Sequence, residues 1–217
     1  MIDTILYDLD GTLVDSNELI LETFHRTLNH FLPNRTFSRE DLLEMMGPPL
    51  QETFEAFAKD QTIIDQMIAF YRNTYVEIEF EHVKPYEGVL ETIRYFRDLG
   101  FHQAIVTTKF YESAAPSIKT FGLDQSIEVV VSLDDVSRPK PHPEPIYKAL
   151  SAFDHDEAVM VGDNATDLLA GRAAGIKTCG VAWSLKRAGL KQTNPDFCIH
   201  QFRDLIDVID RYNKEEH

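Results

Sequence analysis

The fold is decided by the sequence ILYDLDGTLV, residues 5–14. Its first three residues are apolar without polar alternation, a pattern typical of a parallel strand that is buried on both faces. Two carboxylates, Asp8 and Asp10, leave the carboxyl end of this predicted strand with one residue between them. Ligands of open α/β sheets bind at that end of the strands. One carboxylate could therefore attack a substrate while the other moves protons.

Two other interpretations of this segment are a calcium loop and a simple turn. A calcium loop of the EF-hand type that began at Asp8 would need Gly at position 13 and Glu at position 19, and both positions hold Leu. A simple turn does not explain the buried strand before it. The segment therefore predicts a reactive pair of carboxylates.

The rest of the chain alternates short apolar runs with helical periods. Further strands are predicted at residues 104–106, 129–131, 159–161 and 178–182. Helical spacing of apolar residues follows over 87–99 and 166–174, and a glycine ends each period. Strands that alternate with helices predict a doubly wound parallel sheet, a Rossmann-like α/β core.

One interval breaks this alternation. The first strand ends near Asp8 and the next begins near Ala104, while residues 20–31, 50–58 and 64–78 show helical spacing between them. We predict an all-helical domain over 16–84, inserted into a core domain made of 1–15 and 85–217.

Composition narrows the classes of function. The chain of 217 residues has 21 Lys+Arg and 36 Asp+Glu, and this formal net charge of −15 argues against nucleic acid and anionic membranes as partners. Hydrophobic residues make up 43%, which is ordinary globular usage and excludes a disordered chain. Without an 18-residue apolar run or a cleavable leader, a cytoplasmic protein is expected. The two cysteines, Cys179 and Cys198, form no C-x-x-C motif.

The segment DLDGTLVDS, residues 8–16, resembles the first motif of the haloacid dehalogenase-like (HAD) phosphatase superfamily. Segments similar to its other motifs follow in order at later strand ends, namely Thr107-Thr108, Lys140 in KPHP (140–143), and GDNATD (162–167). Apart from the first, each motif is weak or moderate alone. Their order and their position at strand ends make the set specific.

The resemblance implies a catalytic role for each motif. Asp8 would attack phosphorus and form an aspartyl-phosphate, and Asp10 would protonate the leaving group and then activate water. Thr107, Thr108 and Lys140 would bind the phosphoryl oxygens. The ordinary interpretations are a β-branched strand end for the threonines and a solvated surface side chain for the lysine. The prolines around Lys140 favour a functional loop.

The same resemblance implies a Mg²⁺ site. Asp8, the backbone carbonyl of Asp10, and Asp163 would supply its protein ligands, since Mg²⁺ prefers oxygen. Asp167 would support the metal directly or through water. Its ordinary role would be a favourable interaction with the dipole of the helix that begins there.

In this superfamily a helical insert after the first strand is a cap domain that reads the leaving group. The resemblance therefore places substrate binding at Asn17, Gly47 and Arg72 of the insert and at Lys109 of the core. Each has an ordinary interpretation as well. Asn17 and the turn at Gly47 could only start helices, and Arg72 could only pair with a surface carboxylate.

Four further strings resemble a branch of the superfamily that hydrolyses inorganic pyrophosphate, namely NELI (17–20), GPPL (47–50), SLDDV (132–136) and GVAW (180–183). The sequence departs from that branch at Arg138 and over 186–193. The resemblance implies an inorganic diphosphatase with a small phosphorylated or pyrophosphate substrate, and we expect a monomer. A phosphoglycolate phosphatase and a β-phosphoglucomutase-like hexose-phosphate mutase stay open as alternatives.

Overall fold

The chain folds into two compact units. The computed structural model describes residues 1–215, and it describes the side chains of 1–78 and 83–215. The first unit consists of Met1–Asp15 and Pro85–His217, and the second of Ser16–Lys84. The chain passes between the units twice, and the strands that pair at these points are β2 (Val14–Asp15) and β3 (Lys84–Pro85).

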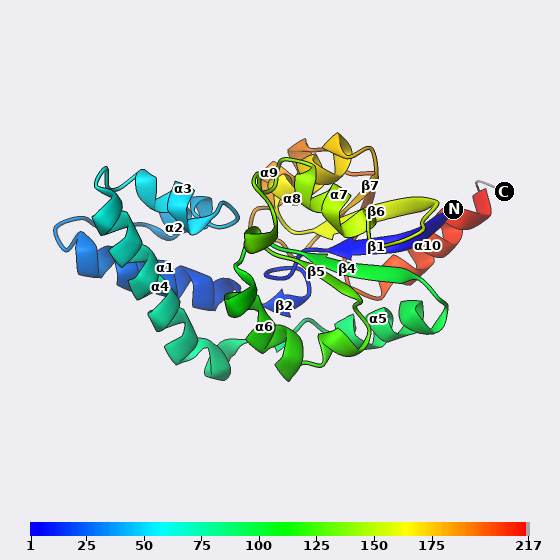
Figure 1. Cartoon of the computed structure of the whole chain (residues 1–217), viewed down its shortest axis with the longest axis horizontal. Coiled ribbons are helices and arrows are strands. Elements are labelled where there is room, and N and C mark those ends of the chain that lie inside the picture. The colour runs from blue at the N-terminus through cyan, green and yellow to red at the C-terminus, as the bar shows by residue number, and fades with distance from the viewer. Residues whose placement is uncertain (216–217) are drawn as a thin grey trace. The chain divides into compact units, whose positions relative to one another are not determined.

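The first unit is built on a six-stranded sheet in the order β5-β4-β1-β6-β7-β8, and each pairing in it is parallel (Figure 1). Its strands are β1 (Ile2–Tyr7), β4 (His102–Val106), β5 (Val129–Val131), β6 (Glu157–Gly162), β7 (Lys177–Val181) and β8 (Phe197–Ile199). The predicted parallel sheet is confirmed. The sequence did not predict β8, because a strand of three residues carries too little pattern to be distinguished from a loop.

Helices cover both faces of this sheet, as a doubly wound fold requires. In Figure 1, α5 (Val89–Asp98) and α10 (Asp204–Glu215) lie on one face, and α7 (Glu144–Leu150) and α8 (Ala165–Ala173) lie on the other. Leu6 of β1 and Met160 of β6 are fully buried in the apolar layer under α7 and α8. The remaining helices of this unit are α6 (Tyr111–Thr120), α9 (Arg187–Gln192) and the 3₁₀ turns η1 (Leu123–Gln125) and η2 (Leu133–Asp135).

The second unit is helical and has a core of its own. It contains α1 (Asn17–Phe31), α2 (Arg39–Glu44), α3 (Leu50–Glu55) and α4 (Gln61–His82). Phe24 contacts Phe54 and Tyr71, with ring centroids 6.0 and 4.7 Å away. The helical spacing over 20–31, 50–58 and 64–78 falls in α1, α3 and α4. The short helix α2 was not predicted, since of its six residues only Leu42 is buried.

The two cysteines differ in their exposure to solvent. Cys179 is buried and Cys198 is exposed, and both are free thiols. Burial raises the pKa of the Cys179 thiol, which disfavours its reactive thiolate.

Within the described part of the chain, no helix combines the length and the apolar character that crossing a membrane would take.

Candidate active site

The site forms where β1, β4 and β6 end. Asp8, Thr107 and Asp163 each follow one of these strands directly. Backbone hydrogen bonds continue beyond the first two strands, from Asp8 N to Val161 O (2.9 Å) and from Thr107 N to Val131 O (2.9 Å). Because neighbouring parallel strands end at the same edge of a sheet, residues from separate parts of the sequence meet there.

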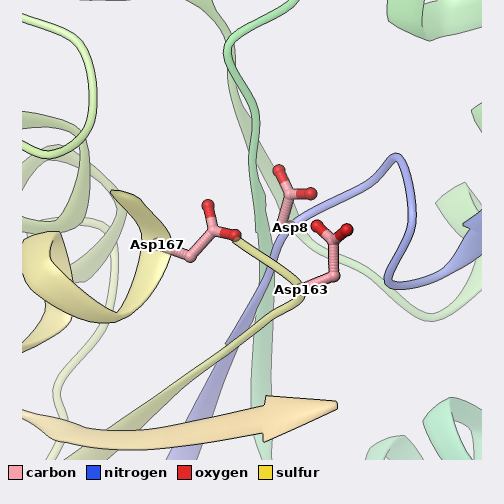
Figure 2. A group of neighbouring side chains, drawn as sticks. All are labelled: Asp8, Asp163 and Asp167. Carbon is pink, nitrogen blue, oxygen red and sulfur yellow. The ribbon is translucent and has the colours of Figure 1, made fainter. Parts of the chain in front are cut away.

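Three carboxylates form an acidic cluster at this edge. Asp8, Asp163 and Asp167 each place an oxygen within 4.8 Å of the others (Figure 2). Only 8%, 8% and 1% of these residues, respectively, is exposed. A buried carboxylate costs free energy unless a cation or hydrogen-bond donors compensate its charge. The cluster therefore requires positive charge close by.

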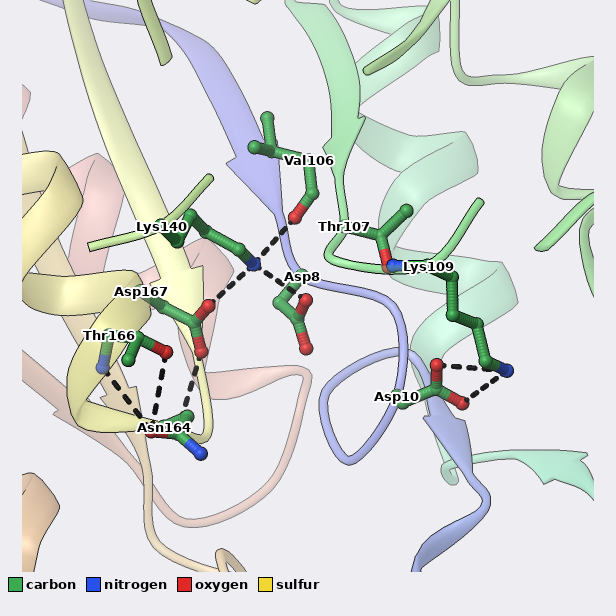
Figure 3. Close-up of polar contacts among 9 residues, drawn as sticks. All are labelled: Asp8, Asp10, Val106, Thr107, Lys109, Lys140, Asn164, Thr166 and Asp167. Atoms are coloured by element: carbon green, nitrogen blue, oxygen red, sulfur yellow. Dashed lines mark hydrogen bonds and ion pairs between the residues drawn. The ribbon is translucent and has the colours of Figure 1, made fainter. Parts of the chain in front are cut away.

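Lys140 supplies part of that charge. Its ammonium donates to Asp8 Oδ1 (2.8 Å), Asp167 Oδ1 (2.6 Å) and the carbonyl oxygen of Val106 (2.7 Å) (Figure 3). An ammonium has three protons to donate, so all of them are used. Lys140 is itself 3% exposed, and the surface-lysine interpretation is wrong.

The pKa values show how the charges in the cluster compete. Burial raises the pKa of Asp8 to about 7, and the Asp167 carboxylate adds to the rise while Lys140 opposes it. Burial, then repulsion from Asp8 and Asp167, raises the pKa of Asp163 well above its usual range. Burial alone would lower the pKa of Lys140, but the Asp167 and Asp8 carboxylates together outweigh it and raise the value. One lysine thus stays charged without neutralising the whole cluster.

Asp10 lies outside this cluster and has a lysine of its own. The ammonium of Lys109 is 3.0 Å from each oxygen of the Asp10 carboxylate. The backbone N–H of Lys109 donates to Thr107 Oγ1 (3.2 Å), so the loop after β4 is also fixed from within. Thr108, between these two residues, is half-buried. Figure 3 shows Asp10 and Lys109 on the side of Asp8 that is away from Lys140.

Asn164 is a site residue that the sequence interpretation missed. Its side-chain oxygen accepts from Thr166 N, and its own backbone N–H donates to Asp167 Oδ2 (2.9 Å). This is a capping box at the start of α8, and it holds the carboxylate that Lys140 contacts. The spacing of Asn164 and Asp167 could have predicted it, since Asn at an N-cap with an acid three residues later is its signature.

Three predicted substrate-binding residues belong to the helical unit. Asn17 is buried at the first position of α1, Gly47 lies in the turn before α3 with φ 105°, and Arg72 is half-buried on α4. Their part in binding substrate stays a prediction.

The chain matches a known protein family over most of its length. The family model of haloacid dehalogenase-like hydrolases matches residues 5–181. The chain belongs to this family. The HAD resemblance is thereby confirmed, and the protein is a HAD-type phosphatase.

Relatives of this HAD enzyme match it along nearly its whole length. The pyrophosphatase PpaX of Bacillus pumilus is 46% identical over 211 residues, which is 96% of each chain. The pyrophosphatase PpaX of Anoxybacillus flavithermus is 46% identical over 217 residues, covering 96% of this chain and 97% of the relative.

Solved structures with lower identity share the fold. A haloacid dehalogenase-like hydrolase from Streptococcus pneumoniae superposes with a TM-score of 0.81 at 24% identity, covering 96% of this chain and 98% of that one. CbbY from Rhodobacter sphaeroides gives a TM-score of 0.80 at 21% identity, covering 94% and 96% of the two chains.

Lys140→Met tests how far the acidic cluster depends on its lysine. The change leaves Asp8 and Asp167 buried without their cation, and we expect the free energy of unfolding to fall by about 3–5 kcal/mol. Urea unfolding, followed by the fluorescence of Trp183 in the same unit, measures it. The matched control is Lys148→Met, which breaks the exposed 3.3 Å pair with Asp135 and should cost at most about 1 kcal/mol. Equal losses in both variants would contradict this view of Lys140.

Gly162→Ala tests the contact between β6 and the cluster. A Cβ at Gly162 would lie 2.4 Å from the Cβ of Asp167, an atom that cannot move aside without its backbone. We expect a loss of about 1–3 kcal/mol in stability and up to about a hundredfold in kcat as Asp167 and Lys140 are displaced. Gly189→Ala is the control, because its Cβ would meet nothing within 4 Å in α9. If the two variants behave alike in unfolding and turnover, close packing at Gly162 is not what constrains the site.

Proposed function

We propose that this enzyme is a Mg²⁺-dependent phosphohydrolase that acts through an aspartyl-phosphate on Asp8, and that its substrate is inorganic pyrophosphate. The observation that carries the mechanism is the position of Asp8. Lys140 holds Asp8 Oδ1, while the described residues place no hydrogen-bond donor on Oδ2. A carboxylate that is oriented through one oxygen and open at the other suits attack on phosphorus.

Asp10 is the group that moves protons in this proposal. Asp10 follows Asp8 by two residues. The ammonium of Lys109 contacts both oxygens of the Asp10 carboxylate and so fixes its direction. Asp10 would protonate the leaving group in the first step and then take a proton from the water that attacks the aspartyl-phosphate. A cleavage that releases halide needs no such proton, so this second acid argues against dehalogenase chemistry.

The four acids of the site form a donor set that fits a divalent cation. Asp8, Asp10, Asp163 and Asp167 carry four negative charges when ionised against two positive charges of Lys109 and Lys140, which leaves −2. We propose that Asp8, Asp163 and the backbone carbonyl of Asp10 would hold Mg²⁺. Bound there, the ion would shield the charge of nucleophile and phosphate. Both oxygens of Asp167 already accept, from Lys140 Nζ and Asn164 N, which favours an indirect role for it.

The phosphoryl oxygens would be bound by groups at the end of β4 and in the loop before α7. Lys140 carries a fixed positive charge beside Asp8, and Thr107 and Thr108 add hydroxyls and backbone N–H groups. The second phosphate of pyrophosphate would need a further cation, and Lys109, whose ammonium contacts Asp10, would supply it. That Ser16–Lys84 acts as a cap domain over the site, with Asn17, Gly47 and Arg72 in contact with substrate, is part of the same proposal.

The choice of pyrophosphate is supported by the PpaX relatives, which are 46% identical over nearly the full chain. A substrate panel tests it. We expect Mg²⁺-dependent release of phosphate with a higher kcat/KM for pyrophosphate than for phosphoglycolate or glucose phosphates.

Two variants test the mechanism. Asp8→Asn should lower kcat by more than about a thousandfold, because the nucleophile is lost. Asp10→Asn should lower kcat by about a hundredfold or more but spare the binding of orthophosphate. A preference for phosphoglycolate would contradict the substrate, and unchanged turnover in Asp8→Asn would contradict the mechanism.

Asp163→Asn tests the metal. In the wild type, Mg²⁺ at a hundred times its dissociation constant should stabilise the fold by about 2.7 kcal/mol. The variant should lose most of this gain. Without metal it should unfold at a higher temperature than the wild type, since a carboxylate that is buried and repelled by its neighbours is gone. Thermal unfolding in EDTA and in Mg²⁺ measures both effects. Asp154→Asn, an exposed acid elsewhere in the same unit, is the control and should respond to Mg²⁺ like the wild type. A full Mg²⁺ response in Asp163→Asn would place the metal elsewhere.

A further inference from the structure

Trp183 makes a hydrogen bond into the loop that carries Asp10. Trp183 follows β7, and its indole N–H donates to the carbonyl oxygen of Gly11 at 3.0 Å. Gly11 is the residue next to Asp10, so this bond joins two loops at the same edge of the sheet. Trp183 is also the single tryptophan of the chain.

Two aromatic rings pack against the indole ring of Trp183. The ring of Tyr86 lies 5.3 Å from it between centroids, and the ring of Phe202 lies 6.4 Å away. Phe202 in turn contacts Tyr7, the last residue of β1, at 5.9 Å. Because the ring is fixed, the direction in which its N–H points is fixed as well.

The loop that receives this bond is tight and closely packed. Gly11 N donates to Val14 O (2.8 Å), and Leu13 N and Val14 N both donate to Leu9 O (2.9 and 3.0 Å). Gly11 has φ 80°, and a Cβ there would lie 2.4 Å from Asp163 Oδ2. A displacement of the Gly11 carbonyl would therefore be passed along the chain to Asp10, the residue before it.

The residue after Trp183 makes the matching bond to the other loop. Ser184 Oγ donates to the backbone carbonyl of Asp163 at 2.6 Å, and Ser184 is 2% exposed. Two successive residues thus hold the two loops that carry Asp10 and Asp163. The two bonds can be broken separately, which makes each a control for the other.

We propose that Trp183 is a positioning residue, whose indole N–H fixes the Gly11 carbonyl and so keeps Asp10 where it can protonate the leaving group. This inference rests on the proton-transfer role that the proposed function gives to Asp10. It predicts an effect that depends on the leaving group, whereas loss of aromatic packing alone would reduce activity toward every substrate equally.

Trp183→Phe tests the proposal, because it keeps an aromatic ring and removes the N–H. Phosphoglycolate releases an alkoxide that needs a proton, while p-nitrophenyl phosphate releases a phenolate that is stable without one. We expect kcat/KM to fall about tenfold or more for phosphoglycolate, toward the 10²–10⁴-fold that a general acid contributes. For p-nitrophenyl phosphate we expect less than about a threefold change, since acid catalysis matters little there. Equal losses for both substrates, or no loss for either, would overturn the proposal.

Two further variants separate this inference from the function on which it rests. Asp10→Asn should show the same selective loss more strongly, and if it does not, the role of Asp10 fails and the proposal for Trp183 fails with it. If Asp10→Asn is selective and Trp183→Phe is not, only the proposal for Trp183 fails. Ser184→Ala should reduce kcat/KM equally for both substrates, because it acts on Asp163. A selective loss in Ser184→Ala would overturn the assignment to Trp183. Neither ester depends on whether pyrophosphate is the natural substrate.

A measurement on the unaltered enzyme guards against a Trp183→Phe variant that fails to fold. A single tryptophan gives a single indole N–H resonance in a ¹H–¹⁵N spectrum. A bond to Gly11 should slow the exchange of this proton with solvent by at least about tenfold relative to free tryptophan, since exchange requires the bond to open. Exchange at the rate of free tryptophan would overturn the proposal without any variant.

Discussion

The rest of the site depends on the need to neutralise three carboxylates that are buried within 4.8 Å of one another. Burial first, and then repulsion between the carboxylates, raises the pKa of Asp8 and of Asp163. Lys140 compensates part of the negative charge by forming ion pairs with both Asp8 and Asp167. The negative charge that remains at this edge of the sheet fits the divalent cation of the proposed mechanism.

Hydrogen bonds from the backbone and from capping side chains hold the site in shape. Asn164 holds the carboxylate of Asp167, and Lys109 holds that of Asp10. Trp183 and Ser184 donate hydrogen bonds to the loops that carry Asp10 and Asp163. Gly11 and Gly162 let these loops approach carboxylates more closely than a Cβ would permit. The carboxylates of Asp8, Asp10 and Asp167 therefore have a set direction before any ligand arrives, which is the preorganisation that catalysis requires.

The acidity of the chain is compatible with an anionic substrate once the charges are located. The formal net charge of −15 includes the four acids of the site, whose purpose in the proposed mechanism is to attack, to move protons and to bind metal. Lys140, Lys109 and the proposed Mg²⁺ would create a local region of positive charge. Screening in salt limits the reach of the more distant surface acids to about 10 Å or less.

The sequence by itself determined the architecture of the first unit and the strand ends that carry its chemistry. Apolar runs without alternation predicted five of the six strands, because a parallel strand that is buried on both faces is apolar along its length. Asp8 and Thr107 follow such runs directly, and Asp163 follows one after Gly162. The helical spacing over 16–84 likewise marks α1, α3 and α4, while the short elements α2 and β8 left no distinct period.

Only the tertiary structure decided which of these side chains contact one another directly. Lys140 lies 132 residues from Asp8, Lys109 lies 99 from Asp10, and Trp183 lies 172 from Gly11, and no local pattern encodes such a pairing. Nor could the sequence say that Lys140 is buried, since a lysine in a proline-rich loop is compatible with solvent. The order of the strands in the sheet brings these loops to one edge. The physical reason is that a strand reveals its burial through its own residues, whereas the contacts of its end depend on which strands become its neighbours.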